Sequence, residues 1–399
     1  MPSDRTTVTE LGTGLGMLGL AGIDEAVRSH TAVMHSLSPE MWERLERLRA
    51  GGAYDAEFHA AWANGHAFLT ADDGLRGRLP QVVEWKGTGR APGDEVAPID
   101  LRVDHVYLVS CKYLSNILFN VSPTSVFDAL LFGGPSRGAR AARELLPGGG
   151  DWYADVAPAE YQALYESVRV AAQHGEATAA PSSPSRLAPP ERPGFAPAPV
   201  ALPGLSTAGA AGMPTADGPR GRPATPALDH LPSRAVDLTV PQREALGHWL
   251  RSGWPQGAKD LYTTLSGAVA RASALRWEAA MHDRSGTGEA MFWRLLRIGS
   301  APYFVLGSSS DRSLRLRIAT SWDWRQHFQL IAISMEGQPG GQPRVGWEAL
   351  VRDRTSREVH AVVGHIEVRW SHGRFGGLPE AKGYLDTPHH LVPGYFTLR

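Results

Sequence analysis

The stretch PIDLRVDHVYLVSCKY, residues 98–113, decides the fold of the first half of the chain. Its β-branched and aromatic residues favour extended structure, and Pro98 suits the start of a strand because proline cannot donate to a sheet ladder. Asp104 and His105 interrupt the apolar pattern at its centre. The stretch therefore predicts an antiparallel hairpin made of residues 99–103 and 106–113.

This hairpin brings a small set of polar side chains together. Because alternate residues of a strand point the same way, Ser110 and Lys112 share one face of the second strand, and Asp100 lies on the first strand. A carboxylate can hold Mg²⁺, which polarises a phosphoryl oxygen and lowers the pKa of a bound water. A lysine can stabilise the negative charge that develops on phosphate. The pattern therefore indicates metal-assisted phosphoryl chemistry.

An aspartate followed by an x-Lys pair on the next strand of a hairpin resembles the core of the PD-(D/E)xK, or restriction-endonuclease-like, nucleases. Asp100 matches the aspartate of that motif and Lys112 matches its lysine, whereas Ser110 stands where the family usually has a second acid. The resemblance implies an α/β (α+β) restriction-endonuclease-like domain, with Mg²⁺ or Mn²⁺ as cofactor and DNA as partner. It also implies a role in restriction or defence against foreign DNA.

Two further acids are candidates for the metal site. In this family a helix before the hairpin often supplies an acid, and Glu57 lies in the first turn of a helix predicted at 55–68. Glu84 lies on a strand predicted at 81–86, beside the strand of Asp100, which makes it the better candidate. We therefore expect Asp100, Glu84 and Glu57 to hold the metal, and Asp100, Lys112, Ser110 and Glu84 to act in catalysis. For Glu57 the alternative is a surface acid that stabilises its helix N-terminus.

Positive side chains that could bind nucleic acid lie in three places. One is the glycine-containing loop after residue 85, which suits contact with a phosphate backbone, and the second is the strand-like segment SLRLRIAT. The third is IEVRWSHGRF, where arginines alternate with aromatic rings and suit phosphate contact combined with base stacking. The alternative is an edge strand protected by charge. The candidates are Lys86, Arg90, Arg315, Arg317, Arg369 and Arg374.

Composition limits the class of protein. The 399 residues suffice for two domains, and the formal net charge of −1 gives no overall basic field, so nucleic acid would have to bind a local patch. The single cysteine, Cys111, excludes an internal disulfide and fits a reducing, cytoplasmic setting. The apolar run at 11–22 is short and has no basic segment before it, so we expect neither a signal peptide nor a membrane span.

The chain divides by composition into three parts. Residues 1–174 form the nuclease-like domain, and residues 175–235, dominated by Pro, Ala, Gly and Ser, predict a disordered linker. Residues 236–399 begin with helical patterns and continue with alternating segments, starting at 292–298. They predict a recognition domain of helices with a β-rich sheet or barrel.

Three other motifs point to weaker alternatives. The G-x-G-x-x-G match at residues 14–19 lacks the preceding strand of a dinucleotide site, so we interpret it as a glycine turn. The E-x-K spacing of Glu380 and Lys382 is flanked by Pro and Gly and indicates a turn. His365 and Glu367 share a strand face, but no third ligand follows them, which favours a structural histidine.

The sequence thus leads to two principal hypotheses. The first is a metal-dependent DNA endonuclease. The second is a non-catalytic nucleic-acid-binding or regulatory protein with a decayed nuclease core, for which the serine at position 110 argues. A cysteine hydrolase using Cys111 and His105 is disfavoured because Cys111 faces away from Ser110 and Lys112. The sequence leaves open whether the protein works as a homodimer or with a partner subunit.

Overall fold

A computed structural model describes nine parts of the chain. They are residues 3–87, 99–113, 117–131, 151–175, 228, 230–282, 286–308, 313–370 and 373–399. Pro98, Arg90 and most of the predicted linker at 175–235 lie outside the described residues.

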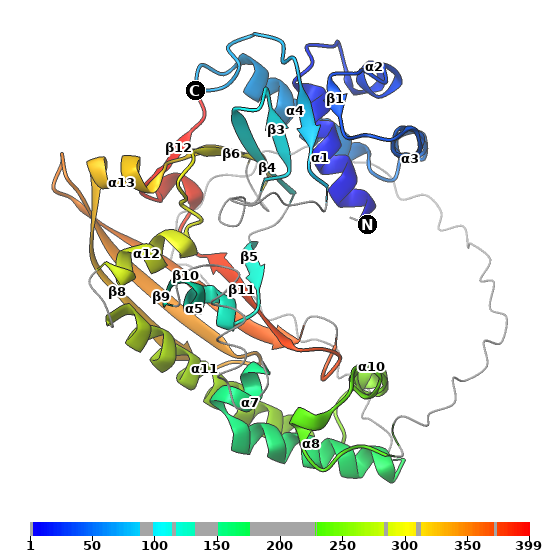
Figure 1. Cartoon of the computed structure of the whole chain (residues 1–399), viewed down its shortest axis with the longest axis vertical. Helices are drawn as coiled ribbons and strands as arrows, with labels where there is room; N and C mark the ends of the chain where they lie inside the picture. Colours follow the sequence, from blue (N-terminus) through cyan, green and yellow to red (C-terminus); the bar gives the residue numbers. More distant parts are fainter. Residues whose placement is uncertain are drawn as a thin grey trace, which may run out of the picture.

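Two β-sheets organise the chain (Figure 1). In the first sheet the strand order is β1-β2-β3-β4-β6-β7-β12, with β1–β2 and β4–β6 parallel and the other pairs antiparallel. Its strands are β1 (Met34–His35), β2 (Val83–Trp85), β3 (Leu101–Val103), β4 (Tyr107–Tyr113), β6 (Tyr303–Ser308), β7 (Ser313–Ile318) and β12 (Tyr395–Thr397).

The second sheet is antiparallel and has the order β5-β11-β10-β9-β8. Its strands are β5 (Ile117–Val121), β8 (Phe328–Gln338), β9 (Arg344–Asp353), β10 (Val359–Trp370) and β11 (Pro379–Leu385). Within the described residues β5 and β8 form its two edges, so this sheet is open and is not the barrel that the sequence allowed. The fold is therefore mixed α/β, as predicted.

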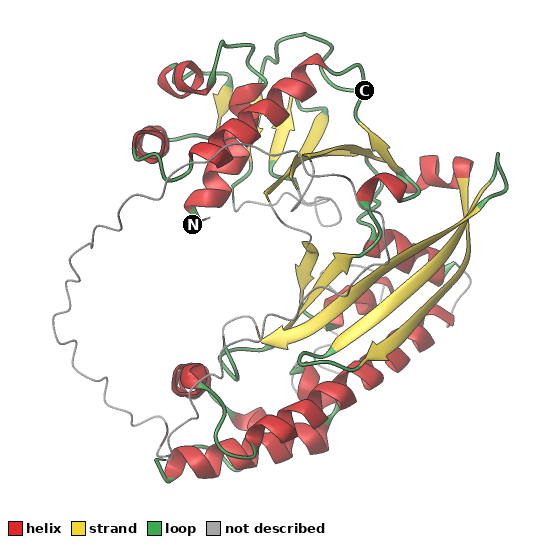
Figure 2. Cartoon of the chain, turned by 180° about the vertical axis from the view of Figure 1, so that it is seen from behind, coloured by secondary structure: helices red, strands yellow, loops and turns green. Residues whose placement is uncertain are grey.

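Helices flank both sheets. Near the first sheet lie α1 (Asp4–Gly16), α2 (Ile23–Arg28), α3 (Pro39–Ala50) and α4 (Asp55–Thr70). The later helices are α5 (Thr124–Leu131), α7 (Trp152–Val156), α8 (Pro158–Gln173), α10 (Val240–Trp249), α11 (Ala258–His282), α12 (Thr287–Leu295) and α13 (Ser321–His327), with 3₁₀ turns η1 (Ala235–Asp237), η2 (Leu250–Ser252) and η3 (His389–Leu391). Figure 2 shows α8 and α11 on the same side of the second sheet.

Each sheet contains strands from both sides of the predicted linker. β4 pairs in parallel with β6, from Val109 opposite Phe304 to Tyr113 opposite Ser308. In the second sheet β5 pairs with β11. The predicted division into 1–174 and 236–399 therefore does not coincide with the two sheets. The physical reason is that alternation identifies a strand without identifying its partner.

The predicted hairpin is present as β3 and β4. Asp104 and His105 have φ values of 49° and 60°, and the Val106 amide donates to the Val103 carbonyl at 3.1 Å. Two central residues with positive φ characterise the type I′ turn, whose twist matches that of the flanking strands. The turn residues thus set the register that places Asp100 beside β4.

The glycine-rich segment near the N-terminus is helical. A Cβ on Gly16 would lie 2.2 Å from the carbonyl oxygen of Trp62, and one on Gly65 would lie 2.0 Å from that of Thr13. These glycines let the backbones of α1 and α4 touch, and this packing outweighs the low helix propensity of glycine. The interpretation of residues 14–19 as a flexible or packed glycine turn is therefore wrong for Gly14 and Gly16, which lie in α1, whereas Met17 and Leu18 form a turn and Gly19 has a φ of 70°.

Two later segments also differ from their predictions. Residues 292–298, expected as a strand, lie mainly in α12, where Met291, Phe292 and Leu295 are buried at helical spacing. Glu380 and Lys382, expected in a turn, lie on β11. Pro379 is tolerated there because it is the first residue of the strand.

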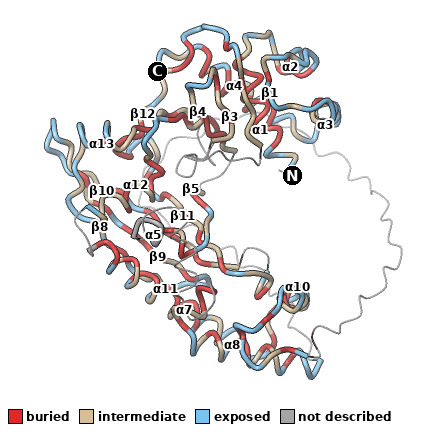
Figure 3. Tube along the Cα trace, in the orientation of Figure 1, coloured by how far each residue is buried: buried red, intermediate tan, exposed pale blue. Residues whose placement is uncertain are grey.

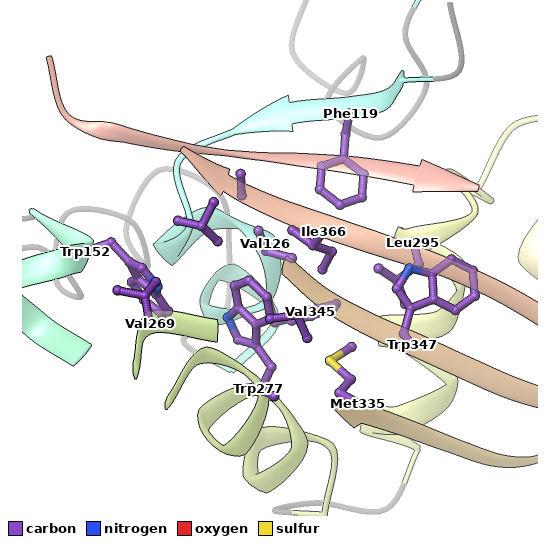
Figure 4. Packing of buried hydrophobic residues seen from close by; sticks show 14 of the residues in the cluster. Phe119, Val126, Trp152, Val269, Trp277, Leu295, Met335, Val345, Trp347 and Ile366 are labelled. Carbon is purple, nitrogen blue, oxygen red and sulfur yellow. The ribbon is translucent and has the colours of Figure 1, made fainter. Parts of the chain in front are cut away.

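Two hydrophobic cores stabilise the sheets. The first lies between α1, α4 and the inner face of the first sheet, and α3 adds the buried side chains of Trp42 and Leu45 while its outer face is exposed (Figure 3). The second core is built around Trp277 of α11 and Val126 of α5, which pack against Val345 and Ile366 of the second sheet (Figure 4). In the described part of the chain, no helix is both long and apolar enough to cross a bilayer.

Candidate active site

Asp100 is held at the point where the β3–β4 ladder ends. Its amide donates to the Val109 carbonyl at 2.9 Å. Its Oδ2 accepts the backbone N–H of Cys111 at 2.6 Å and the hydroxyl of Ser110 at 3.3 Å. The carboxylate therefore takes the place of the next ladder acceptor, and hydrogen bonds from β4 fix its orientation.

Strand alternation separates two sets of side chains on β4. Val109 and Cys111 belong to the core beneath α1. Ser110 and Lys112 alternate with them and so face the other way. Asp100 contacts Ser110 directly, so the structure brings these two predicted residues together.

Lys112 lies within electrostatic range of Asp100. Burial lowers the pKa of the Lys112 ammonium, and the nearby Arg297 lowers it further. Attraction from Asp100 and, more weakly, from Glu10 acts in the opposite direction. Asp100 thus acts on Lys112 more strongly than Glu10 does, and Lys112 faces away from the core beneath α1.

Glu10 is the acid that the sequence interpretation missed. It lies on α1, is 7% exposed, and its Oε2 accepts the indole N–H of Trp85 at 2.6 Å. Burial and the neighbouring Asp100 raise the pKa of Glu10 to about 8, although the Trp85 hydrogen bond and Lys112 oppose that rise. Asp100 thus adds its negative charge to the effect of burial on the pKa of Glu10.

A local signal for this helix is visible in retrospect. Ser3 caps α1 by accepting the amide of Thr6, and Val8, Leu11 and Leu15 recur at helical spacing. Those residues predict α1, and Glu10 with it, once the glycines are interpreted as positions of close packing. Its approach to Asp100 depends on tertiary packing.

The two acids chosen from the sequence have other partners. Glu84 forms an ion pair with Lys86 at 3.1 Å, and its register partner on β3 is Arg102. Glu57 forms an ion pair with Arg5 at 3.0 Å. Glu84 and Glu57 thus pair directly with neighbouring cations, whereas the charge of Asp100 raises the pKa of Glu10.

The predicted nucleic-acid-binding residues lie in separate places. On β7, Arg315 donates to the Asn64 side chain at 3.1 Å, and Arg317 lies 5.0 Å from the Phe396 ring. At the end of the second sheet, Arg369 pairs with Glu367 at 3.4 Å. The Arg374 guanidinium there lies 4.7 Å from the Trp254 ring. The arginines of β7 and those at the end of the second sheet therefore do not form one surface for nucleic acid.

The remaining alternatives are weakened by their surroundings. His365 Nδ1 lies 2.8 Å from the Asp386 carboxylate, and its ring stacks on Tyr384, which fits the structural role predicted for it. His105 is exposed in the hairpin turn, whereas Cys111 is buried and burial raises its thiol pKa well above the usual range. A thiol of that kind is a poor nucleophile.

The described residues contain no ready-made metal cage. Across the described ranges, the His, Cys, Asp and Glu side chains form no group of three or more that could hold a metal ion. Comparison with protein-family models, curated proteins and solved structures finds no match to this chain. Support for a function therefore comes from the residues of the site itself.

Proposed function

We propose that this protein is a metal-dependent endonuclease that hydrolyses DNA phosphodiester bonds. One observation carries the proposal: hydrogen bonds from Cys111 and Ser110 of β4 hold the Asp100 carboxylate, and its charge acts on the pKa of both Glu10 and Lys112. A carboxylate held in place, whose charge reaches a second acid on one side and an amine on the other, favours binding of a cation and a phosphate.

The donor set fits Mg²⁺ or Mn²⁺. Mg²⁺ keeps several waters and uses one or two protein carboxylates together with substrate phosphates, so it does not need a cage of three protein ligands. Asp100 and Glu10 would supply the two carboxylates. When bound, such an ion would polarise the phosphoryl oxygen and lower the pKa of an attacking water.

The chain's own groups have distinct roles in this proposal. The Ser110 hydroxyl and the Cys111 amide orient the Asp100 carboxylate, so it needs little rearrangement when substrate arrives. Lys112 contacts a phosphate oxygen and stabilises the negative charge of the transition state. Burial and Asp100 raise the pKa of Glu10 to about 8, so Glu10 would hold a proton at neutral pH and a bound cation would favour its loss.

The arrangement of elements also supports the resemblance to PD-(D/E)xK nucleases. In that family a helix before the hairpin often supplies an acid, and α1 carries Glu10 to the hairpin. The resemblance also requires a helix after the hairpin, and α5 follows β4 and β5.

A non-catalytic nucleic-acid-binding or regulatory protein is the second candidate. The observation in its favour is Ser110, which occupies the position of an acid and donates to Asp100, where an acid would add a metal ligand. In this alternative the same surface contacts phosphate without cleaving it.

Cleavage assays separate the two candidates. Linear, circular and single-stranded DNA would be incubated with Mg²⁺, Mn²⁺ or EDTA. The nuclease proposal predicts metal-dependent cleavage by the wild type and its loss in Lys112→Ala and in Asp100→Ala. DNA binding without cleavage under either ion would favour the second candidate.

A further inference from the structure

The outer face of the second sheet carries an exposed apolar row near one end. By register, Leu350 of β9 lies between Ala332 of β8 and Ala361 of β10. Leu350 alternates with the buried Ala349 and Val351, so the row points away from the core, and none of its three residues is among the described members of either hydrophobic core. Both alanines of the row are exposed and Leu350 is half-buried. Figure 2 views this face, with the helices that cover the other face behind the strands.

Neighbouring side chains extend this apolar surface. On β10, Val359 is 50% exposed and Val363 is 37% exposed, and each lies two residues from Ala361 on the same face. Ile331 of β8, next to Ala332, is 41% exposed. Single exposed apolar side chains are ordinary, but a contiguous group of them indicates an interaction surface.

Two opposite charges flank the row on β9. Glu348 lies two residues before Leu350 and Arg352 lies two residues after it, on the same face of the sheet. Within the described residues, neither of these charged side chains forms a hydrogen bond or an ion pair. They lie about 13 Å apart along the strand, so they cannot pair with each other. Both charges are therefore available to a partner.

A twofold axis along the row would make this pattern complementary to a second copy. The rotation stacks β9 antiparallel on its own copy and exchanges the position two residues before Leu350 with the position two residues after it. Arg352 then faces Glu348 of the second copy, and the two flanking valines of β10 meet in the same way. A twofold axis parallel to the strands would instead bring like charges together, which is unfavourable.

We propose that this face binds a second copy of this chain, in a twofold-symmetric dimer whose axis follows the row of Ala332, Leu350 and Ala361. A symmetric interface brings the same patch of two subunits together, so the patch must be complementary to itself. An apolar centre with a negative charge on one side and a positive charge on the other has this property. The dimer does not depend on the proposed nuclease function, because no residue of this face belongs to the site around Asp100.

The size of the face suits such a dimer. The strands β8–β11 are about ten residues long, and with a spacing of about 4.8 Å and a rise of about 3.3 Å per residue they cover on the order of 600 Å². Two such faces would bury about 1,200 Å² in total, which is the lower end of the range for specific interfaces.

Pairing through the edge of β8 is less favourable than packing through the face. The ladder between β8 and β9 shifts at Ile331, between Leu330 and Ala332. Such a bulge in an edge strand interrupts the row of backbone groups that a further strand would need. Packing of two sheets face to face uses side chains and does not need those backbone groups.

Charge reversal tests the geometry of the dimer. Sedimentation equilibrium in EDTA, over a wide range of protein concentrations, would compare wild type with Arg352→Glu, with Glu348→Arg and with the double variant. Each single variant places like charges together at two symmetry-related contacts, so we expect the dissociation constant of the dimer to rise about tenfold. The double variant exchanges the two charges and should return the dissociation constant to the wild-type value. Damage to the fold would not be repaired in this way.

A position on the axis meets its own copy, which gives a second test. In Ala361→Arg two like charges would meet at the centre of the interface, and we expect the dissociation constant to rise on the order of 100-fold. Leu275→Arg changes a side chain that is 69% exposed on α11, and Arg47→Glu reverses an exposed charge on α3, so both controls should dimerise like wild type. Dimerisation of Ala361→Arg at the wild-type concentration would overturn the proposal.

Crosslinking places the axis without weakening the dimer. The single native cysteine, Cys111, is buried, so a bismaleimide of about 10 Å, which is the packing distance of two sheets, should join two chains of Ala361→Cys. Covalent dimers from Ala361→Cys, and none from Leu275→Cys, support the proposal. Equal yields from the two variants overturn it. A wild type that sediments as a monomer at its highest soluble concentration also overturns it and leaves this face to a different partner.

Discussion

Two buried carboxyl sites of this protein differ in how their charge is balanced. Asp151, which caps α7, is 1% exposed and accepts from the Tyr161 hydroxyl at 3.0 Å and from the Arg243 guanidinium at 3.1 Å. Burial raises the pKa of Asp151, while Arg243 and Tyr161 oppose that rise. Asp151 therefore has its own cation and hydrogen-bond donors.

At the other site the larger effect of a neighbouring charge, that of Asp100, adds to the effect of burial. The pKa of Glu10 is raised first by burial and then by Asp100, and Lys112 offsets this only in part. A carboxyl group paired within the fold holds elements together. Two carboxyl groups forced near each other remain able to gain from an added cation. This difference distinguishes a structural buried acid from a candidate catalytic one.

The largest expected effect tests the structural side of the comparison. Asp151→Ala leaves the buried Arg243 without its carboxylate partner, and we expect the free energy of unfolding to fall by about 3–5 kcal/mol. Urea denaturation would measure the change. Asp237→Ala, which removes an exposed ion pair with Arg234, should alter it little. A small loss in Asp151→Ala would remove the contrast between the two sites.

The next effect concerns the transition-state charge. Lys112→Ala should lower the cleavage rate on the order of 10²-fold, because an electrostatic donor in a partly buried site is lost. Single-turnover rates with saturating Mg²⁺ would measure this, with Arg47→Ala as the exposed control. Cleavage by Lys112→Ala at the control rate would show that the amine is only structural.

The raised pKa of Glu10 predicts a pH dependence of stability. Its folded pKa of about 8 exceeds the unfolded value of 4.5, so between these pH values the folded state holds a proton that the unfolded state has lost. The contribution of Glu10 to stability is therefore lost as pH rises through this window, at up to about 1.4 kcal/mol per pH unit. Glu10→Gln should remove this part of the slope.

Urea denaturation in EDTA at several pH values between 5 and 8 would test it. In a second series, with Mg²⁺ in place of EDTA, the ion should stabilise the wild type more at the higher pH, because Mg²⁺ binding displaces the proton of Glu10. Equal slopes in wild type and Glu10→Gln would show that Glu10 titrates normally.

The smallest effect is expected at Cys111. Its thiol lies in the core beneath α1, on the opposite face from Lys112. Cys111→Ala should therefore leave the cleavage rate unchanged, as measured beside wild type under the same conditions. A complete loss of activity, with folding intact by circular dichroism, would revive the cysteine-hydrolase alternative.

Those parts of the fold that depend on local chemistry could be predicted from the sequence. The Asp104-His105 turn places β3 and β4, and Ser38 with Pro39 marks the start of α3. The contact of Asp100 with Ser110 follows from the same hairpin. Sequence patterns suffice to predict a turn or a helix start, because turn residues and cap residues bind backbone groups a few positions away in the sequence.

The remainder depends on contacts between distant segments. Gly16 packs on Trp62 only because α1 meets α4, and the parallel β4–β6 pairing joins segments on both sides of the predicted linker. The packing of α1 against α4 and the first sheet places Glu10 near Asp100. Glu84 instead forms an ion pair with Lys86, and Glu57 forms one with Arg5. Alternation and spacing carry no information about such partners.

The central claim is that Asp100 acts through its charge at a cation-dependent site. The most direct measurement compares DNA cleavage by wild type, Asp100→Asn and the exposed control Asp55→Asn, each with Mg²⁺, Mn²⁺ and EDTA. Asparagine can still accept the Cys111 N–H, so the fold should persist. We predict cleavage by wild type and the control only with metal, and a loss on the order of 10³-fold in Asp100→Asn. Equal metal-dependent cleavage by all three proteins would contradict the claim.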